Sequence, residues 1–162
     1  MDEAWAALMQ PLPYLWPAAL VIVCAALVVR LGPLRAWWAE RRLGLDQVDA
    51  LSGEQFERFL ARFFARAGWQ VEEVGGRGDF GADLIVTYQG YRTAVQAKRS
   101  ASPVGVAAIQ EVVGARSHYD CEYAMVVTNS HYTAAAQTLA TSCGVELWDR
   151  DDLQQQIERY SR

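Results

Sequence analysis

The feature that most constrains the fold is a hairpin pattern in the middle of the chain. Residues 82–88 and 91–98 are rich in Val, Ile, Leu, Tyr and Thr, which favour β-strands. Gln89-Gly90 separates the two runs, and a glycine at the second position of a two-residue loop is typical of a primed hairpin turn. The turn fixes the pairing, because each step away from it advances one residue along both strands. The sequence therefore predicts an antiparallel hairpin in which Tyr88 lies opposite Tyr91.

This pairing places three polar side chains on one face of the hairpin. Asp83 lies directly opposite Gln96, and Lys98 lies two residues further along, on the same face. A hard cation such as Mg²⁺ binds carboxylates and neutral oxygens, which Asp83, the Gln96 amide and the Ala97 carbonyl would supply. Lys98 would orient an attacking water or stabilise the charge of a phosphorane-like transition state. The trio thus suits metal-dependent cleavage of a phosphodiester bond, and a solvated face with a chance Asp–Lys pair is the alternative.

A long apolar run lies near the N-terminus. Residues 14–31 contain no charged side chain before Arg30, and this length is near the short limit of about 17–25 residues for a bilayer span. Aromatic residues lie at both ends, acidic residues precede the run and basic residues follow it. We therefore expect a transmembrane anchor within residues 1–32, a juxtamembrane linker over 33–48, and a domain over 49–162 on the cytoplasmic side of the inner membrane. A cleaved signal peptide and a buried core helix are the alternatives.

The remainder of the chain has the pattern of one α/β domain. Ser52 and Gln55 have the spacing of a capping box, and apolar residues then recur at helical intervals until Gly68. Further strands are expected at 69–74, 123–127 and 145–148, and further helices at about 104–117, 134–142 and 150–160. This order predicts a mixed sheet flanked by helices.

Other classes of site have no support in the sequence. The glycine-rich residues 75–81 lack the Lys-Ser/Thr of a P-loop, and a strand rather than a helix follows them. The three cysteines show neither a disulfide framework nor zinc-ligand spacing. His118 and His131 are isolated, and no Gly-x-Ser-x-Gly motif is present, so a serine or cysteine hydrolase is not indicated.

Four segments occur in a distinctive order and spacing. They are LSGEQFE at 51–57, GGRGDFGADLI at 75–85, QAK at 96–98 and PVGV at 103–106. Together they resemble the Mrr-type restriction endonuclease domain of the PD-(D/E)XK nuclease superfamily, over about residues 46–160.

The resemblance implies an αβββαβ core, here preceded by one transmembrane helix, and a DNA endonuclease dependent on Mg²⁺ or Mn²⁺. The active-site pattern of the family carries over as Glu57 on the first helix, Asp83, Gln96 and Lys98. Gln96 stands where the wider superfamily usually has Glu or Asp, and resembles the Mrr branch. An amide brings no charge, so we expect a weaker metal site than two carboxylates would give, unless Glu57 contributes.

Two features depart from the family pattern. The Mrr-type restriction enzymes carry a separate DNA-recognition domain, for which this chain has no room. The chain is also acidic, with 15 Lys and Arg against 19 Asp and Glu and a net charge of −4, whereas tight nonspecific DNA binding relies on basic phosphate contacts. DNA contacts are therefore expected either from a local basic face, with Arg77, Arg92 and Arg99 as candidates, or from a partner. A catalytically weak or inactive module that acts as a membrane-tethered nucleic-acid-binding or scaffold protein is the alternative function, and a homodimer stays open.

Overall fold

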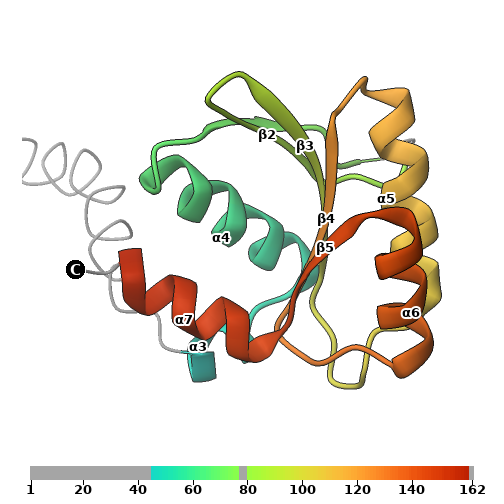
Figure 1. The fold of residues 1–162 in the computed structure, drawn as a ribbon. Coiled ribbons are helices and arrows are strands. Elements are labelled where there is room, and N and C mark those ends of the chain that lie inside the picture. Colours follow the sequence, from blue (N-terminus) through green and yellow to red (C-terminus); the bar gives the residue numbers. More distant parts are fainter. Residues whose placement is uncertain (1–44, 77–79, 161–162) are drawn as a thin grey trace, which may run out of the picture. The chain divides into compact units, whose positions relative to one another are not determined.

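The computed structural model of the chain describes residues 45–76 and 80–160 (Figure 1). They lie within one compact unit, Leu43–Arg162. Among these described residues, no helix combines the length and the apolar character that a membrane span requires. The span predicted at residues 14–31 lies outside them.

The centre of the fold is a five-stranded mixed sheet with the strand order β1-β2-β3-β4-β5. The strands are β1 (Gln70–Glu73), β2 (Leu84–Tyr88), β3 (Tyr91–Lys98), β4 (Tyr123–Thr128) and β5 (Val145–Trp148). Strands β1, β2 and β3 pair antiparallel, whereas β3, β4 and β5 pair parallel. The predicted mixed sheet is therefore confirmed.

The hairpin has the predicted register. Tyr88 pairs with Tyr91, and Leu84 pairs with Val95. Gln89 and Gly90 both have positive φ, 51° and 88°, as a type I′ turn requires. The turn chemistry therefore sets which side chains of β2 and β3 share a face.

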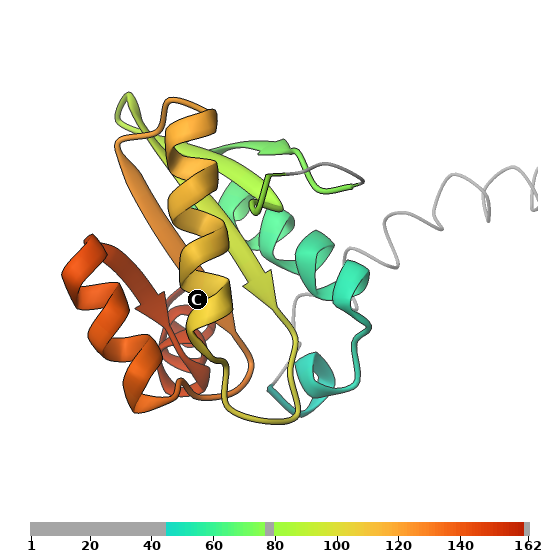
Figure 2. The same ribbon diagram turned by 90° about the vertical axis from the view of Figure 1, so that its right-hand side faces the viewer.

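Helices cover both faces of the sheet (Figures 1 and 2). Helices α5 (Val106–His118) and α6 (Ala134–Cys143) pack on one face, where Ile109 and Val112 are fully buried. On the other face lie α3 (Leu45–Asp49), α4 (Gly53–Arg66) and α7 (Arg150–Tyr160). Phe56, Leu60 and Phe64 of α4 and Val48 of α3 are fully buried in this second core. The two side-chain layers bury the central residues of β3 and most of β4.

Local signals explain where most helices begin. Ser52 and Gln55 form the predicted capping box at α4, and the Thr133 hydroxyl accepts from the Ala136 N–H at the start of α6. Helix α5 begins at Val106, two residues later than expected. The reason is that Val104 forms an isolated bridge with Tyr132, which holds the segment before α5 extended.

Candidate active site

Asp83 lies just before β2, and its carboxylate accepts a backbone N–H of β3. The Asp83 N–H donates to the Val95 carbonyl at 2.9 Å, on the same residue that pairs with Leu84. Asp83 Oδ2 accepts the Ala97 N–H at 2.7 Å. Asp83 is only 6% exposed, so these contacts fix a buried carboxylate at the C-terminal end of β3.

Gln96 lies beside Asp83, as the register predicts. Its Nε2 donates to Asp83 Oδ2 at 2.6 Å, and the side chain is 5% exposed. The same nitrogen is 3.5 Å from the Ala97 carbonyl oxygen. In this structure the amide nitrogen, rather than the amide oxygen, thus faces the carboxylate, and Gln96 orients Asp83.

Glu57 reaches toward Asp83 across a glycine. A Cβ placed on Gly75 would lie 3.6 Å from Glu57 Oε2 and 3.6 Å from both the Cα and the carbonyl oxygen of Asp83. The N–H groups of Val74 and Gly75 donate to that same Asp83 carbonyl at 2.9 and 3.0 Å. Glu57 Oε2 of α4 therefore lies near the backbone of Asp83, and the lack of a side chain at Gly75 leaves room for this approach.

Lys98 forms an ion pair with a carboxylate of α5. Its Nζ lies 2.7 Å from Glu111 Oε2, and the two side chains are 35% and 44% exposed. The sequence analysis gave Glu111 no role. The one signal for it in the sequence is its place beside Ile109 and Val112, the buried residues of the helix that follows β3.

Gly81 explains how α5 comes so close to the Asp83 loop. It has φ of +91°, and a Cβ there would lie 2.5 Å from the Glu111 carbonyl oxygen and 2.9 Å from the Glu111 Cα. The loop backbone therefore packs directly on the backbone of α5, at the residue whose carboxylate binds Lys98.

The three arginines predicted to bind DNA differ in position. Arg77 lies outside the described residues. Arg92 is at the N-terminal end of β3, far along the strand from Lys98, and its Nη1 donates to the Tyr119 carbonyl at 2.7 Å. Arg99 directly follows Lys98, and its guanidinium donates to the Asp49 carbonyl. Neither Arg92 nor Arg99 joins the group around Asp83 in these contacts.

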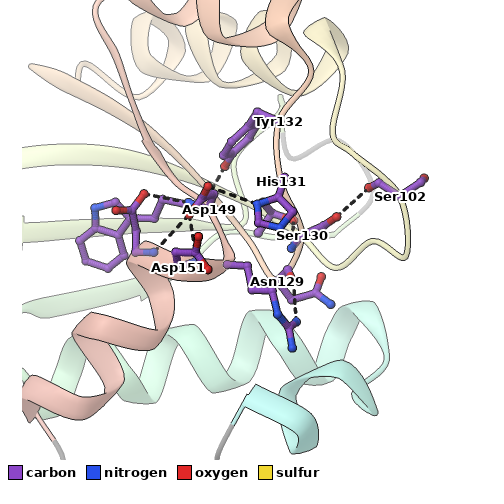
Figure 3. Close-up of polar contacts among 11 residues, drawn as sticks. Ser102, Asn129, Ser130, His131, Tyr132, Asp149 and Asp151 are labelled. Carbon is purple, nitrogen blue, oxygen red and sulfur yellow. Dashed lines mark hydrogen bonds and ion pairs between the residues drawn. The ribbon is translucent and has the colours of Figure 1, made fainter.

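A second polar group lies at the start of α7 (Figure 3). Ligand atoms of His131, Asp149 and Asp151 lie within 4.8 Å of one another. Asp149 Oδ1 accepts the N–H groups of Asp151 and Asp152, and Asp149 Oδ2 is 3.4 Å from His131 Nδ1. Burial would raise the pKa of Asp149, but the Asp152 N–H, His131 and the Asp151 N–H together lower it. Helix capping and one His–Asp contact thus account for this group.

A third network ties α3 to the ends of distant elements. Asp49 Oδ1 accepts from Asn129 Nδ2 at 2.9 Å and from Arg150 Nη1 at 2.8 Å. Arg150 Nη1 also donates to the Asn129 carbonyl at 3.0 Å. The hydrogen bond from Arg150, followed by that from Asn129, lowers the pKa of Asp49.

The structure thus combines a mixed five-stranded sheet with a buried Asp83 and Gln96 and with Lys98 on the same face of β3 as Gln96. Residues 48–157 match the Mrr_cat family, restriction endonuclease. The match covers more than half of the chain, so the chain belongs to this family of DNA-cleaving nucleases, as its motifs predicted.

Two solved structures are similar to the chain. One is the protein of unknown function AF1548, at 17% identity and a TM-score of 0.48, over 57% of this chain and 55% of that one. The other is the DNA modification-dependent restriction endonuclease AspBHI, at 18% identity and a TM-score of 0.46, over 76% of this chain and 41% of that one. The chain thus spans about half the length of these proteins. No curated protein matches it.

Proposed function

We propose that the chain is a metal-dependent DNA endonuclease whose active site consists of Asp83, Gln96, Lys98 and Glu57. The observation that carries the proposal is the buried Asp83 carboxylate held by Gln96 and the Ala97 N–H at the end of β3. Membership of the Mrr_cat family supports the same reaction.

The donors around Asp83 fit a hard divalent cation. Asp83 and Glu57 would hold it through carboxylate oxygens, and Gln96 and the Ala97 carbonyl offer neutral oxygens, which are the ligand types of Mg²⁺ and Mn²⁺. When bound, such an ion polarises a phosphoryl oxygen and lowers the pKa of a bound water. Use of the Gln96 oxygen would require the amide to turn over, because its nitrogen now donates to Asp83.

Lys98 supplies the positive charge for the reaction. Water attacks the phosphorus, the bond from phosphorus to the leaving oxygen breaks, and negative charge grows on the phosphoryl oxygens. An ammonium group with three N–H donors can orient the water or bind that charge. Glu111 limits the positions open to the flexible lysine side chain, since the two groups are 2.7 Å apart.

The test uses the full chain, kept in a mild detergent, and supercoiled plasmid with Mg²⁺, Mn²⁺ or EDTA. A nuclease that cuts within a strand converts a closed circle into nicked and linear forms, which an enzyme needing free ends cannot do. We expect cleavage with either metal, none with EDTA, and at least a 100-fold loss in Lys98→Ala, the order of magnitude for removal of one transition-state contact.

The matched pair of variants is Glu57→Gln and Glu54→Gln, which lie one turn apart on α4. Glu54 contacts Arg58 at the exposed start of the helix, so its loss should leave cleavage unchanged. Cleavage that persists in Glu57→Gln, in Asp83→Asn and in Lys98→Ala would refute this site.

We also propose that residues 14–31 anchor the enzyme in the cytoplasmic membrane, with the nuclease domain inside the cell. The support is the apolar run and the basic residues after it. A reporter that is active only in the periplasm, fused after Arg162, should stay silent. Activity of that reporter would contradict this topology.

One observation favours a second candidate function, a non-catalytic nucleic-acid-binding or scaffold module. The neutral Gln96 donates to Asp83 and occupies an oxygen that a metal would use. Calorimetric titration with Mn²⁺ distinguishes the two functions. No heat of binding at millimolar Mn²⁺, with or without DNA, would favour this second function.

A further inference from the structure

An exposed aromatic pair lies beside the candidate active site. Phe80, three residues before Asp83, is 61% exposed. Its ring stacks on the imidazole of His118, the last residue of α5, with a centroid distance of 3.8 Å and an interplanar angle of 21°. The imidazole covers one face of the phenyl ring, and the large exposed fraction means that the other face is open to solvent.

The backbone holds Phe80 in an unfavourable conformation for its type. Its φ is 51°, a region that bulky side chains rarely adopt. The next residue, Gly81, packs on the backbone of α5 at Glu111, so the loop cannot relax without leaving the helix. Burial of the phenyl ring does not offset this strain, because most of the ring is exposed to solvent. Such outliers are concentrated at functional sites.

The aromatic pair and the ion pair of Lys98 are both attached to α5. Lys98 contacts this helix through Glu111, and Phe80 contacts it through His118. His118 follows Glu111 by seven positions, which corresponds to about 10.5 Å along a helix.

We propose that Phe80, supported by His118, stacks on an unpaired nucleobase of the substrate close to the bond that is cut. A phenyl face binds any base, because every base has a π-face. Bases within an intact duplex already stack on one another. The enzyme therefore favours substrates with unpaired or displaced nucleotides near the cut. This inference rests on the proposed nuclease function.

The first experiment measures contact directly. The full chain in EDTA, which keeps the substrate intact, is irradiated with oligonucleotides that carry 5-iodouracil at one position, either single-stranded or fully paired. Iodouracil forms crosslinks to aromatic side chains on which it stacks. We expect a crosslink at Phe80 with the single strand, and little with the duplex.

The second experiment measures affinity by fluorescence anisotropy at fixed salt. Phe80→Leu should weaken binding of the single strand roughly 5- to 150-fold, the equivalent of one lost base–aromatic stack, and should change duplex binding little. Phe80→Trp should retain the affinity. The matched control is Tyr91→Leu, since Tyr91 is 56% exposed and its odd position on β3 places it on the sheet face opposite Lys98.

The outcomes separate this inference from the proposed function. Unchanged single-strand affinity in Phe80→Leu, equal losses for single strand and duplex, or a crosslink that maps elsewhere would each overturn the stacking role. A thermal unfolding scan shows whether Phe80→Leu is folded. If it is not, Phe80→Trp provides the test, because loss of the crosslink in that variant would overturn the stacking role. A crosslink at Phe80 with no cleavage, in Mn²⁺, of either the plasmid or the single-stranded oligonucleotide would refute the nuclease activity alone.

Discussion

Replacement of Gly81 by alanine tests how tightly the Asp83 loop packs on α5. The new methyl group would lie 2.5 Å from the carbonyl oxygen, 2.7 Å from the carbonyl carbon and 2.9 Å from the Cα of Glu111. All three are backbone atoms of a helix, so none can move aside as a flexible side chain would. The loop itself must shift, and Phe80 and Asp83 lie one and two residues away.

The expected cost has two parts. An L-residue at positive φ costs roughly 1–2 kcal/mol, and forcing an extra methyl into a packed contact costs roughly 1–3 kcal/mol. Gly81→Ala should therefore lower the free energy of unfolding by about 2–5 kcal/mol. Gly68→Ala provides the control, because Gly68 has φ of +89° but no atom within 4 Å of its Cβ position. Gly68→Ala should therefore lower the free energy of unfolding only by the cost of an L-residue at positive φ.

Urea unfolding followed by circular dichroism measures both variants. The difference between them isolates the steric contact, and we expect Gly81→Ala to be the less stable by about 1–3 kcal/mol. Gly90→Ala, with φ of +88° and open space, should behave like Gly68→Ala. An equal decrease in the free energy of unfolding at all three positions would show that the Asp83 loop does not pack tightly on α5 at Gly81.

Three further predictions concern other contacts. Glu111→Gln should reduce plasmid cleavage by about tenfold or more. It should change the free energy of unfolding by less than about 1 kcal/mol, because the ion pair between Glu111 and Lys98 is partly exposed. Equal cleavage by the variant and the parent would contradict a role of Glu111 in positioning Lys98. Arg150 lowers the folded pKa of Asp49 below its ordinary 3.8. The ionised Asp49 therefore stabilises the fold fully above pH 3.8, and this contribution to the free energy of unfolding is lost as the pH falls through the folded pKa. Urea titrations at pH 7 and pH 3 should show that acid lowers the free energy of unfolding less in Asp49→Asn than in the parent. Tyr132→Phe should destabilise the domain by about 0.5–1.5 kcal/mol, since its buried hydroxyl donates to a β4 carbonyl at 2.8 Å, and an unchanged urea midpoint would rule this out.

The hairpin could be predicted from sequence because its determinants are local. A two-residue turn at Gln89-Gly90 and the two-residue period of strands are enough to place Asp83 beside Gln96. The capping box of α4 is equally local, since Ser52 and Gln55 are three residues apart. Each of these features depends on interactions within one hairpin or one helix turn.

The ion pair between Lys98 and Glu111 could not be predicted in the same way. It depends on how α5 is rotated on the sheet, and that rotation is limited by the contact with Gly81, thirty residues earlier in the chain. The start of α5 was misplaced for a similar reason, because Val104 pairs with Tyr132 from the loop after β4. The contact between Asp49 and Arg150 joins residues 101 positions apart, and no sequence period reports such a pairing.

The contacts of Asp49 determine how the domain responds to tension on its N-terminal side. A pull on the chain ahead of Leu45 is resisted first by the buried side chain of Val48 and by the hydrogen bonds from Arg150 and Asn129 to Asp49. Asn129 immediately follows β4, and Arg99, which also donates to Asp49, immediately follows Lys98. A force applied ahead of Leu45 would therefore act on the C-terminal ends of β3 and β4, and the end of β3 carries Gln96 and Lys98 of the candidate active site.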